Sequence, residues 1–163
     1  MSNSNSKKNI NSQLIAFINR RNNEPRKVIE YPVCKAFTDE NGEPIKWKII
    51  KKTAQELQSI RDKFTRISRK NKDAEISAVA VQDEIMGECI IYPNLKDVEL
   101  ADALMPNAPL DQRTPGNLLK VIVDDDAELQ FLFGLISELH RWNKTESEMI
   151  AEQKALINEA KNS

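Results

Sequence analysis

One stretch of the sequence changes its apolar spacing along its length: residues 45–69, IKWKIIKKTAQELQSIRDKFTRISR. In the first part, apolar residues alternate with lysines around Trp47, which is typical of a strand with one buried face. In the second part, apolar residues recur at the steps of three and four that line one face of a helix. They are Leu57, Ile60, Phe64 and Ile67. Because Thr53 and Glu56 between the two parts match the Ser/Thr-x-x-Glu capping box, the stretch predicts a strand followed by a helix over residues 54–69.

A polar turn precedes this strand and indicates a β-hairpin. Asn41-Gly42 supplies residues that tolerate the positive φ of a tight reversal. β-Branched and aromatic residues are common on its other side, so we expect strands near residues 28–37 and 45–51. Pro32 lies inside the first strand and cannot donate a ladder hydrogen bond, so that strand should be at the sheet edge or bulged. A two-stranded ribbon is marginal alone, so one face should rest on helices.

The middle of the chain has the pattern of two further helices. One is predicted from Asp73, with a wide apolar stripe, to a stop at Tyr92-Pro93. A shorter helix capped by Asn94 should follow to about Leu104. Residues 105–113 contain two prolines and should form an ordered loop.

The last third of the chain carries three signals for helix starts. Thr114-Pro115 places an N-cap residue before a proline at the first helical position. Aspartates at 124–126 begin a longer helix over residues 126–142, since acidic side chains suit the positive end of the helix dipole. A second capping box at Thr145–Glu148 begins an amphipathic segment that runs to about Ala160.

These elements make the chain mainly α with a small N-terminal β-hairpin, an α+β fold arranged as a compact helical bundle. Residues 1–11 are rich in Ser, Asn and Lys and should form a disordered tail. Residues 12–142 should form a single helical domain, with the hairpin near residues 28–51. Residues 143–163 should be a mobile amphipathic segment.

A short amphipathic helix is predicted at the N-terminal end of this domain. Ser12 can cap it, and its apolar face consists of Leu14, Ile15, Phe17 and Ile18. A helix of this length is marginal in water, so it should dock on a surface of this chain or of another.

The composition excludes several classes of chemistry. The 163 residues include one His, two Cys and four Gly, too few for a zinc site of three or four His and Cys ligands or for Gly-rich phosphate loops. No apolar run approaches the about 20 residues of a membrane helix, and the polar start lacks a signal-peptide core. We therefore expect a cytoplasmic protein with reduced thiols, no metal, no cofactor and no membrane partner.

The residues that could carry catalysis have structural explanations. His140 lies in a predicted helix without a nucleophile placed beside it by a motif, which favours a satisfied or exposed helical histidine over a general acid or base. Cys34 and Cys89 lie in apolar contexts and favour small buried residues over reactive thiols. The aspartates at 124–126 lack the Gly and distal Glu of a calcium loop and favour helix capping. We therefore predict no catalytic residue and no enzyme.

The net charge of −1 hides a division between the two halves of the chain. Residues 1–72 carry 17 Lys and Arg against 7 Asp and Glu, and residues 73–163 carry 7 against 18. The basic residues near the hairpin fit a solvated face, a site for an acidic protein or, least favoured, a nucleic-acid footprint beside Trp47. They are Lys46, Lys48, Lys51, Lys52, Arg61, Lys63, Arg66, Arg69, Lys70 and Lys72. Two oppositely charged surfaces would also suit head-to-tail self-association.

One stripe of the last long helix is a candidate partner-binding surface. Phe131, Leu135 and Trp142 share a face at helical spacing. They are either core residues or an exposed anchor patch, rich in the aromatic residues that dominate interface energies. The C-terminal segment with Met149 and Ile150 could cover this patch in the free protein and leave it on binding. The candidate partner-binding residues are therefore Phe131, Leu135, Trp142, Met149 and Ile150.

Three stretches together resemble a known family. The first is FTDENGEPIKWKIIKKTAQELQSIRDKFTR, residues 37–66, a polar turn followed by a Trp-bearing strand and a helix. The second is CIIYPNLKDVELADAL, residues 89–104, in which an apolar helix end meets Tyr-Pro and a short acidic helix. The third is the Leu118-Leu119 helix followed by Glu128-Leu129 and Leu139. Across its predicted helical domain the chain is similar to the XkdN-like tail assembly chaperones of tailed phages and PBSX-type defective prophages.

This resemblance implies a small, mostly helical cytoplasmic protein of virion assembly, with no catalytic residue to carry over. Such chaperones bind the tape measure protein, keep it soluble and help recruit tail tube subunits. The expected partners are therefore the tape measure protein and the tail tube protein. The alternative function is a small nucleic-acid-binding regulatory protein that uses the basic N-terminal half, and it predicts binding that weakens steeply with salt.

Overall fold

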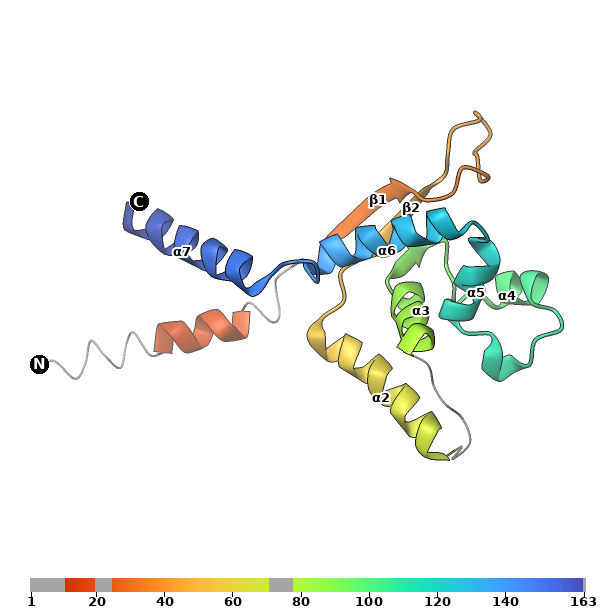
Figure 1. The fold of residues 1–163 in the computed structure, drawn as a ribbon, viewed down its shortest axis with the longest axis horizontal. Coiled ribbons are helices and arrows are strands. Elements are labelled where there is room, and N and C mark those ends of the chain that lie inside the picture. The colour runs from red at the N-terminus through yellow and green to blue at the C-terminus, as the bar shows by residue number, and fades with distance from the viewer. Residues whose placement is uncertain (1–10, 20–24, 71–77, 163) are drawn as a thin grey trace, which may run out of the picture.

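A three-stranded antiparallel sheet and the helices packed against it form the body of the molecule (Figure 1). The computed structural model describes residues 11–19, 25–70 and 78–162. The strands are β1 (Val28–Pro32), β2 (Lys46–Ile50) and β3 (Ile90–Tyr92), in the order β1-β2-β3. Helices make up most of the secondary structure, so the prediction of a mainly helical α+β fold is confirmed.

The first two strands form the predicted hairpin in shortened form. β1 pairs with β2 so that Tyr31 lies opposite Trp47 and Pro32 lies opposite Lys46. Pro32 is the last residue of an edge strand, where its missing N–H interrupts no ladder between strands. In the turn, Gly42 has a φ of 79°, a conformation that glycine adopts without a steric penalty.

Residues 90–92 form a third strand, although the apolar pattern predicts a helix there. Helix α3 (Ala78–Glu88) ends before them, and they pair antiparallel with β2. The Ile50 N–H donates to the Cys89 carbonyl at 2.8 Å, so the second edge of β2 is not left with unpaired backbone groups next to the core. The sheet is therefore more than an N-terminal hairpin. The predicted helix start at Asp73 lies outside the described residues.

Helix α2 (Ala54–Lys70) begins at the predicted capping box. Thr53 Oγ1 accepts the backbone N–H of Glu56 at 3.1 Å, and Glu56 Oε1 accepts the backbone N–H of Thr53 at 3.4 Å. Leu57 is buried on the inner face of the helix. The helix predicted over residues 54–69 is therefore confirmed, because local side chains define its start.

Four further α-helices and one 3₁₀ turn are described, and each of these four α-helices begins at a capping residue. They are α4 (Val98–Leu104), the 3₁₀ turn η1 (Leu110–Gln112), α5 (Pro115–Ile122), α6 (Asp126–His140) and α7 (Glu146–Asn162). Thr114 and Thr145, both predicted, cap α5 and α7 with their hydroxyls 3.3 and 3.2 Å from the donating N–H groups. α4 begins after Asp97 rather than Asn94, because the Asp97 carboxylate accepts two N–H groups of its first turn.

The core lies between the sheet, α3, α5 and α6. Its fully buried side chains include Trp47, Ile49, Met86, Leu118, Leu119, Leu132 and Ile136. α3 and α5 approach closely through two glycines, since a Cβ at Gly87 would lie 2.6 Å from the Gly116 nitrogen. Glu84 of α3 accepts the Gly116 N–H at 3.2 Å, which places a carboxylate at the positive end of α5. The two helices are therefore joined by both packing and charge.

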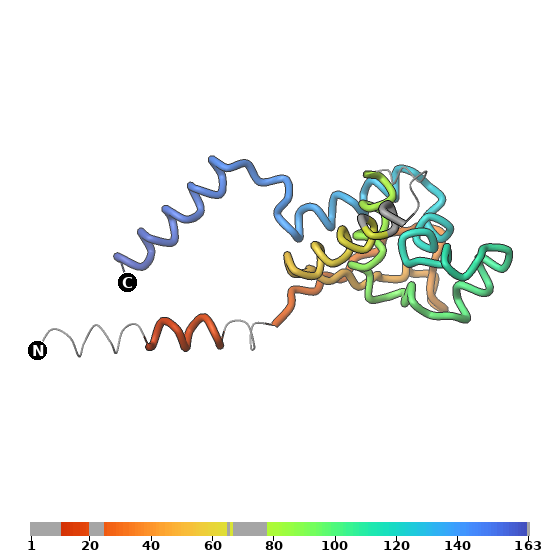
Figure 2. The backbone as a smooth tube through the Cα atoms, turned by 90° about the horizontal axis from the view of Figure 1, so that it is seen from below, coloured from red at the N-terminus to blue at the C-terminus, as the bar shows by residue number. Residues whose placement is uncertain are grey.

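Two helices extend from the body on one side. In Figures 1 and 2, residues 11–19 and α7 lead away from the end of the body at which α6 ends. Residues 11–19 are helical, which confirms the predicted short N-terminal helix. The predicted disordered tail lies outside the described residues except for Asn11, and the mobility of residues 143–163 stays a prediction.

Candidate protein-binding surfaces

Helix α6 divides its apolar residues between the core and the surface. Leu132 and Ile136, from one predicted stripe, are fully buried. Phe131 keeps 43% of its surface exposed, and its ring packs against Tyr31 of β1 with the ring centroids 5.5 Å apart. Leu135 lies one turn later and is half-buried. Because helix positions four apart share a face, Phe131 and Leu135 both lie on the side of α6 next to β1.

The surface between β1 and α6 is hollowed along its length, and we call it the β1–α6 seam. Two neighbouring hollows of about 400 and 510 Å³ lie there, and Tyr31 lines both of them. The apolar lining consists of Ile29, Tyr31, Pro32, Val33, Cys34, Pro44, Ala127, Phe131, Leu135 and Leu139. The charged rim consists of Lys27, Glu30, Lys35, Asp125, Glu128 and Glu138. An apolar floor inside a polar rim is the arrangement found in protein interfaces.

Trp142 lies apart from Phe131 and Leu135, so the predicted three-residue stripe is divided. α6 ends at His140 instead of continuing to residue 142, because Arg141 takes a left-handed φ of 62° and turns the chain. The Trp142 ring stacks on the His140 ring, with centroids 4.6 Å apart, and lines a separate hollow between α2, α3 and α6. Helical spacing does not hold beyond a left-handed residue, which is why the sequence pattern misplaces Trp142.

His140 is a buried histidine whose ring joins two parts of the body. Its Nδ1 donates to the Ile136 carbonyl at 2.8 Å, and its Nε2 accepts the backbone N–H of Lys52 at 2.9 Å. Burial lowers the pKa of the imidazole below its ordinary value of 6.5, although the bond to the Ile136 carbonyl opposes this. The neutral ring therefore fixes the connection between β2 and α2, in agreement with the predicted satisfied helical histidine.

Both cysteines are buried thiols. Burial raises the pKa of the Cys89 thiol to about 12. Burial also raises the pKa of the Cys34 thiol to about 12, with a further contribution from the neighbouring Glu128 carboxylate. A thiol with such a pKa carries almost no thiolate at neutral pH, so both residues act as small apolar side chains, as predicted.

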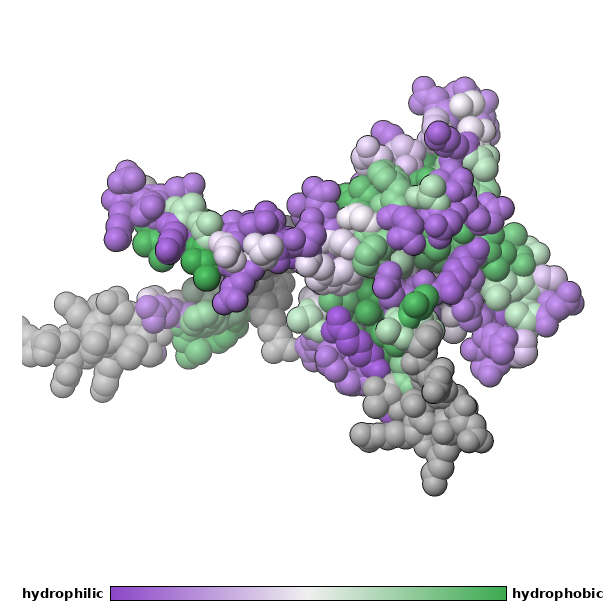
Figure 3. Space-filling view, viewed as in Figure 1, coloured by the Kyte–Doolittle hydropathy of each residue, from purple (hydrophilic) through white to green (hydrophobic). Residues whose placement is uncertain are grey.

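Helix α7 presents an uncovered apolar face. Met149 and Ile150 are followed seven residues later by Leu156 and Ile157, which places all four on one side of the helix. Their exposed fractions lie between 37% and 57%, and none of the residues of α7 is buried. Figure 3 shows apolar side chains along the edge of α7 that looks toward residues 11–19.

Polar contacts at the start of α7 hold it in an extended position. Glu152 forms ion pairs with Arg141 and, at 2.9 Å, with Lys144. α7 therefore leads away from the predicted patch on α6 instead of covering it (Figure 1). The covering of Phe131 and Leu135 by this segment, expected from the sequence, is not the arrangement of this structure.

Residues 11–19 present a second uncovered apolar face. Their four large apolar side chains are between 51% and 74% exposed, with Phe17 the most exposed of them. The sequence predicted this helix and its need for a docking surface, but it did not identify the surface. Ile29 and Tyr31, which complete the β1–α6 seam, were also missed, although their spacing of two along a strand is the signal of a shared face.

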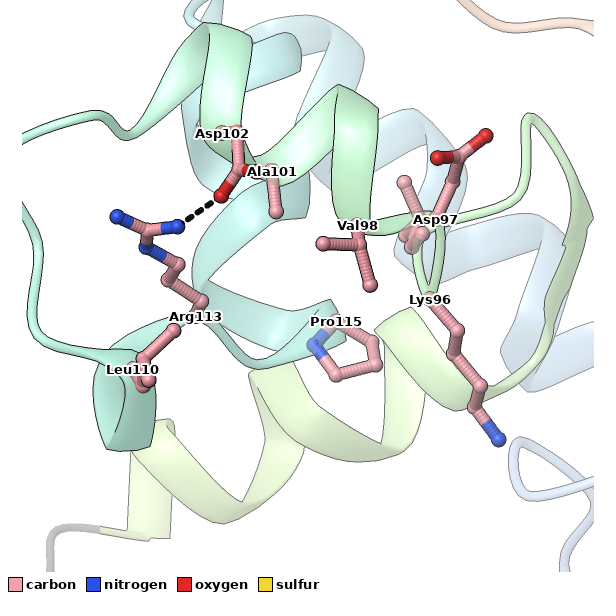
Figure 4. Close-up of a pocket in the computed structure, with 9 residues that line it drawn as sticks. Lys96, Asp97, Val98, Ala101, Asp102, Leu110, Arg113 and Pro115 are labelled. Atoms are coloured by element: carbon pink, nitrogen blue, oxygen red, sulfur yellow. Dashed lines mark hydrogen bonds and ion pairs between the residues drawn. The ribbon is translucent and has the colours of Figure 1, made fainter.

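A further hollow, of about 280 Å³, lies between α4 and η1 (Figure 4). Arg113 crosses it to form an ion pair with Asp102, and it also donates to the carbonyls of Ala108 at 3.0 Å and Pro106 at 3.3 Å. The guanidinium thereby ties α4 to the loop over residues 105–113. We assign this cluster to the stability of the predicted ordered loop.

Trp47 of the basic hairpin is buried and cannot serve as the surface for base stacking that a nucleic-acid footprint beside it would need. Trp47 is only 2% exposed, and Lys48 and Lys52 lie near carboxylates, 3.9 Å from Glu30 and 3.4 Å from Glu56. In the described part of the chain, no group of three or more His, Cys, Asp or Glu side chains could hold a metal ion. None of the helices described there is long and apolar enough to cross a membrane.

Known proteins are similar to this chain in sequence pattern and in fold. A family described as phage XkdN-like tail assembly chaperone protein matches residues 14–154. The crystal structure of the protein YqbN matches with a TM-score of 0.55 at 18% identity, over 71% of this chain and 85% of that chain. At this identity the likeness concerns the fold alone. No curated protein matches the chain.

Proposed function

The chain belongs to the XkdN-like phage tail assembly chaperones, and we propose that it binds the tape measure protein, keeps it soluble and helps recruit tail tube subunits. The tape measure and tail tube proteins are then its partners, and the cytoplasm of the host cell is its place of action. Its work is binding, with no chemical step. Phe131, Leu135, Trp142, Met149 and Ile150 stay the candidate contact residues.

The uncovered apolar face of α7 carries this proposal. The helix has 17 residues and therefore spans about 25 Å. Its four exposed apolar side chains can lie against an apolar stripe of a partner helix, since helices pack by interdigitating such ridges. A tape measure protein is long and helical, and its apolar stripes are exposed until the tube surrounds it, so it offers such stripes repeatedly.

Trp142 adds an aromatic anchor near the start of α7. The residue is 41% exposed, and Trp is among the side chains that contribute most to interface energies. A single helix with one anchor gives a weak contact. Several copies bound along one tape measure chain reinforce one another through their high local concentration, and weak single contacts allow release when tube subunits polymerise.

Co-expression with the tape measure protein tests the proposal. The chaperone should raise the soluble fraction of the tape measure protein, and the double variant Ile150→Ser, Ile157→Ser should abolish most of that gain. Truncation of each exposed side chain removes about 1 kcal/mol of apolar contact, repeated at every bound copy. The measurement is the tape measure protein in the soluble fraction of the lysate.

The control is Val98→Ser, which removes a still more exposed apolar side chain, 70% exposed, on α4, far from α7 in the fold. It should keep the full solubilising effect. If the tape measure protein is equally insoluble with and without the unmodified chaperone, the proposal is wrong. If the α7 and α4 variants keep the tape measure protein equally soluble, the chain is still a chaperone, but α7 is not its binding surface.

A further inference from the structure

The helix over residues 11–19 cannot be explained by contacts with its own body. It has nine residues, all of them exposed. Isolated helices of this length are marginal in water, and Leu14, Ile15, Phe17 and Ile18 form an apolar face with more than half of each side chain exposed. The helix therefore needs an apolar surface to lie on.

The β1–α6 seam is a matching surface in chemistry and in length. Its floor is apolar and its middle carries Phe131 and Leu135. The stretch of α6 that lines it, from Ala127 to Leu139, spans about 18 Å, and a nine-residue helix spans about 14 Å. The helix can thus lie along α6 with its apolar face against the Phe131 and Leu135 side chains.

We infer that two copies of the chain exchange these helices, each laying its residues 11–19 into the β1–α6 seam of the other. The direction in which the helix extends indicates that it binds the seam of a second copy instead of the seam of its own chain. Figures 1 and 2 show residues 11–19 leading away from the body at the end of the seam where β1 begins and α6 ends. Two bodies that meet at this end are each within reach of the helix of the other.

The area buried also favours a mutual exchange. One short helix on one seam buries less than the about 1,200–2,000 Å² of a stable protein interface. A two-fold arrangement makes the same contact twice, because each copy contributes both a helix and a seam. The doubled contact therefore comes closer to that range than a single helix on a single seam.

The sequence on either side of the helix is basic, whereas the α6 side of the seam is acidic; Lys27 and Lys35 lie on the β1 side. Residues 11–19 carry no charge, but the sequence places Lys7-Lys8 before them and Arg20-Arg21 after them. The α6 side of the seam carries acidic residues toward both of its ends, Asp125 and Glu128 at one and Glu138 at the other. Complementary charges guide association and fix its register. This interface covers Phe131 and Leu135, which are also candidate contact residues for the tape measure protein, but it leaves the apolar face of α7, which carries the proposed function, uncovered.

A disulfide cross-link tests the exchange in the full chain. Ile15→Cys and Leu135→Cys place one new thiol on the helix and one in the seam. Mild oxidation should give a covalent dimer on a non-reducing gel, while the control pair Ile15→Cys, Val98→Cys should stay monomeric. Both native cysteines are buried, with the pKa of each thiol raised to about 12. Because Cys34 lines the seam, both pairs also carry Cys34→Ala. An internally cross-linked monomer, or no cross-link at all, overturns the inference.

Sedimentation velocity provides a second readout without new thiols. Phe17→Ser on the helix and Phe131→Ser on the seam should each raise the dimer dissociation constant by about tenfold or more. Phe17 is 74% exposed, so this substitution leaves the body intact. A mixture of the two variants should form heterodimers with one intact helix–seam contact.

The control Val98→Ser should dimerise like the unmodified chain. If Phe17→Ser leaves the dissociation constant unchanged, or the unmodified chain stays monomeric at all concentrations, the exchange does not occur.

Discussion

Helix α5 has eight residues and buries three of them, whereas α7 has seventeen residues and buries none. α5 is capped by Thr114, packs on α3 through two glycines and places Leu118 and Leu119 in the core. α7 is capped by Thr145 in the same way. Its described tertiary contacts include the ion pairs of Glu152, which lies near the start of the helix.

The difference shows that two kinds of force shape this chain. The body is held by burial of apolar surface, which is the largest favourable term in folding. The terminal helices are defined by local caps and amphipathic spacing, and their apolar faces stay in contact with water. Faces of this kind are maintained for a partner, because exposure brings no stability to the chain itself.

The largest expected effect separates the two helices directly. Leu119→Ala in α5 should lower the free energy of unfolding by about 2–5 kcal/mol, because it leaves a cavity in a packed core. Leu156→Ala in α7 should change it by less than about 0.5 kcal/mol, since that side chain is 57% exposed. Urea unfolding of both variants measures the two effects. Equal losses of stability would mean that α7 packs on the body in solution.

A glycine pair gives the next effect. Gly87→Ala should destabilise the protein by about 1–3 kcal/mol, because the added Cβ would lie 2.6 Å from the backbone of α5. Gly134→Ala is the control, since a Cβ there meets nothing within 4 Å. In the interior of α6 this change should stabilise by about 0.5–1 kcal/mol. Thermal unfolding of the two variants should shift in opposite directions, and a shared direction would contradict the close approach of α3 and α5.

The smallest expected effect is a dependence of the free energy of unfolding on pH, which arises from His140 in the body of the molecule. Burial holds the pKa of His140 below 6.5 in the folded state, so the unfolded chain takes up a proton more readily as the pH falls through about 6.5. Stability should therefore be complete above this pH and decline below it, with a slope of at most about 1.4 kcal/mol per pH unit. Urea unfolding at pH 7.5, 6.5 and 5.5 measures the slope.

The control for this titration is His140→Gln, which removes the titrating group and keeps a side chain with both a donor and an acceptor. This variant should be less stable at neutral pH and should lose most of the slope between pH 7.5 and 5.5. An unchanged slope in His140→Gln would place the titrating group elsewhere.

Sequence reasoning succeeded where the deciding groups are neighbours along the chain. The caps at Thr53, Thr114 and Thr145 lie within three residues of the N–H groups that they accept. The same reasoning failed at Ile90–Tyr92, because a short apolar run suits a helix or a strand and its β2 partner lies far away in the sequence. It failed at Trp142 because the left-handed turn at Arg141 carries no clear sequence signal, since glycine usually occupies such positions.

By itself the sequence determined the helices that begin at Thr53, Thr114 and Thr145, the hairpin, the mainly helical class and the amphipathic faces of the two terminal helices. All of these follow from interactions over a few residues. The tertiary structure decided that Phe131 and Leu135 join Ile29 and Tyr31 in one seam, while α7 remains uncovered. Such choices depend on which distant surfaces bury each other, and the apolar pattern of a single segment does not contain that information.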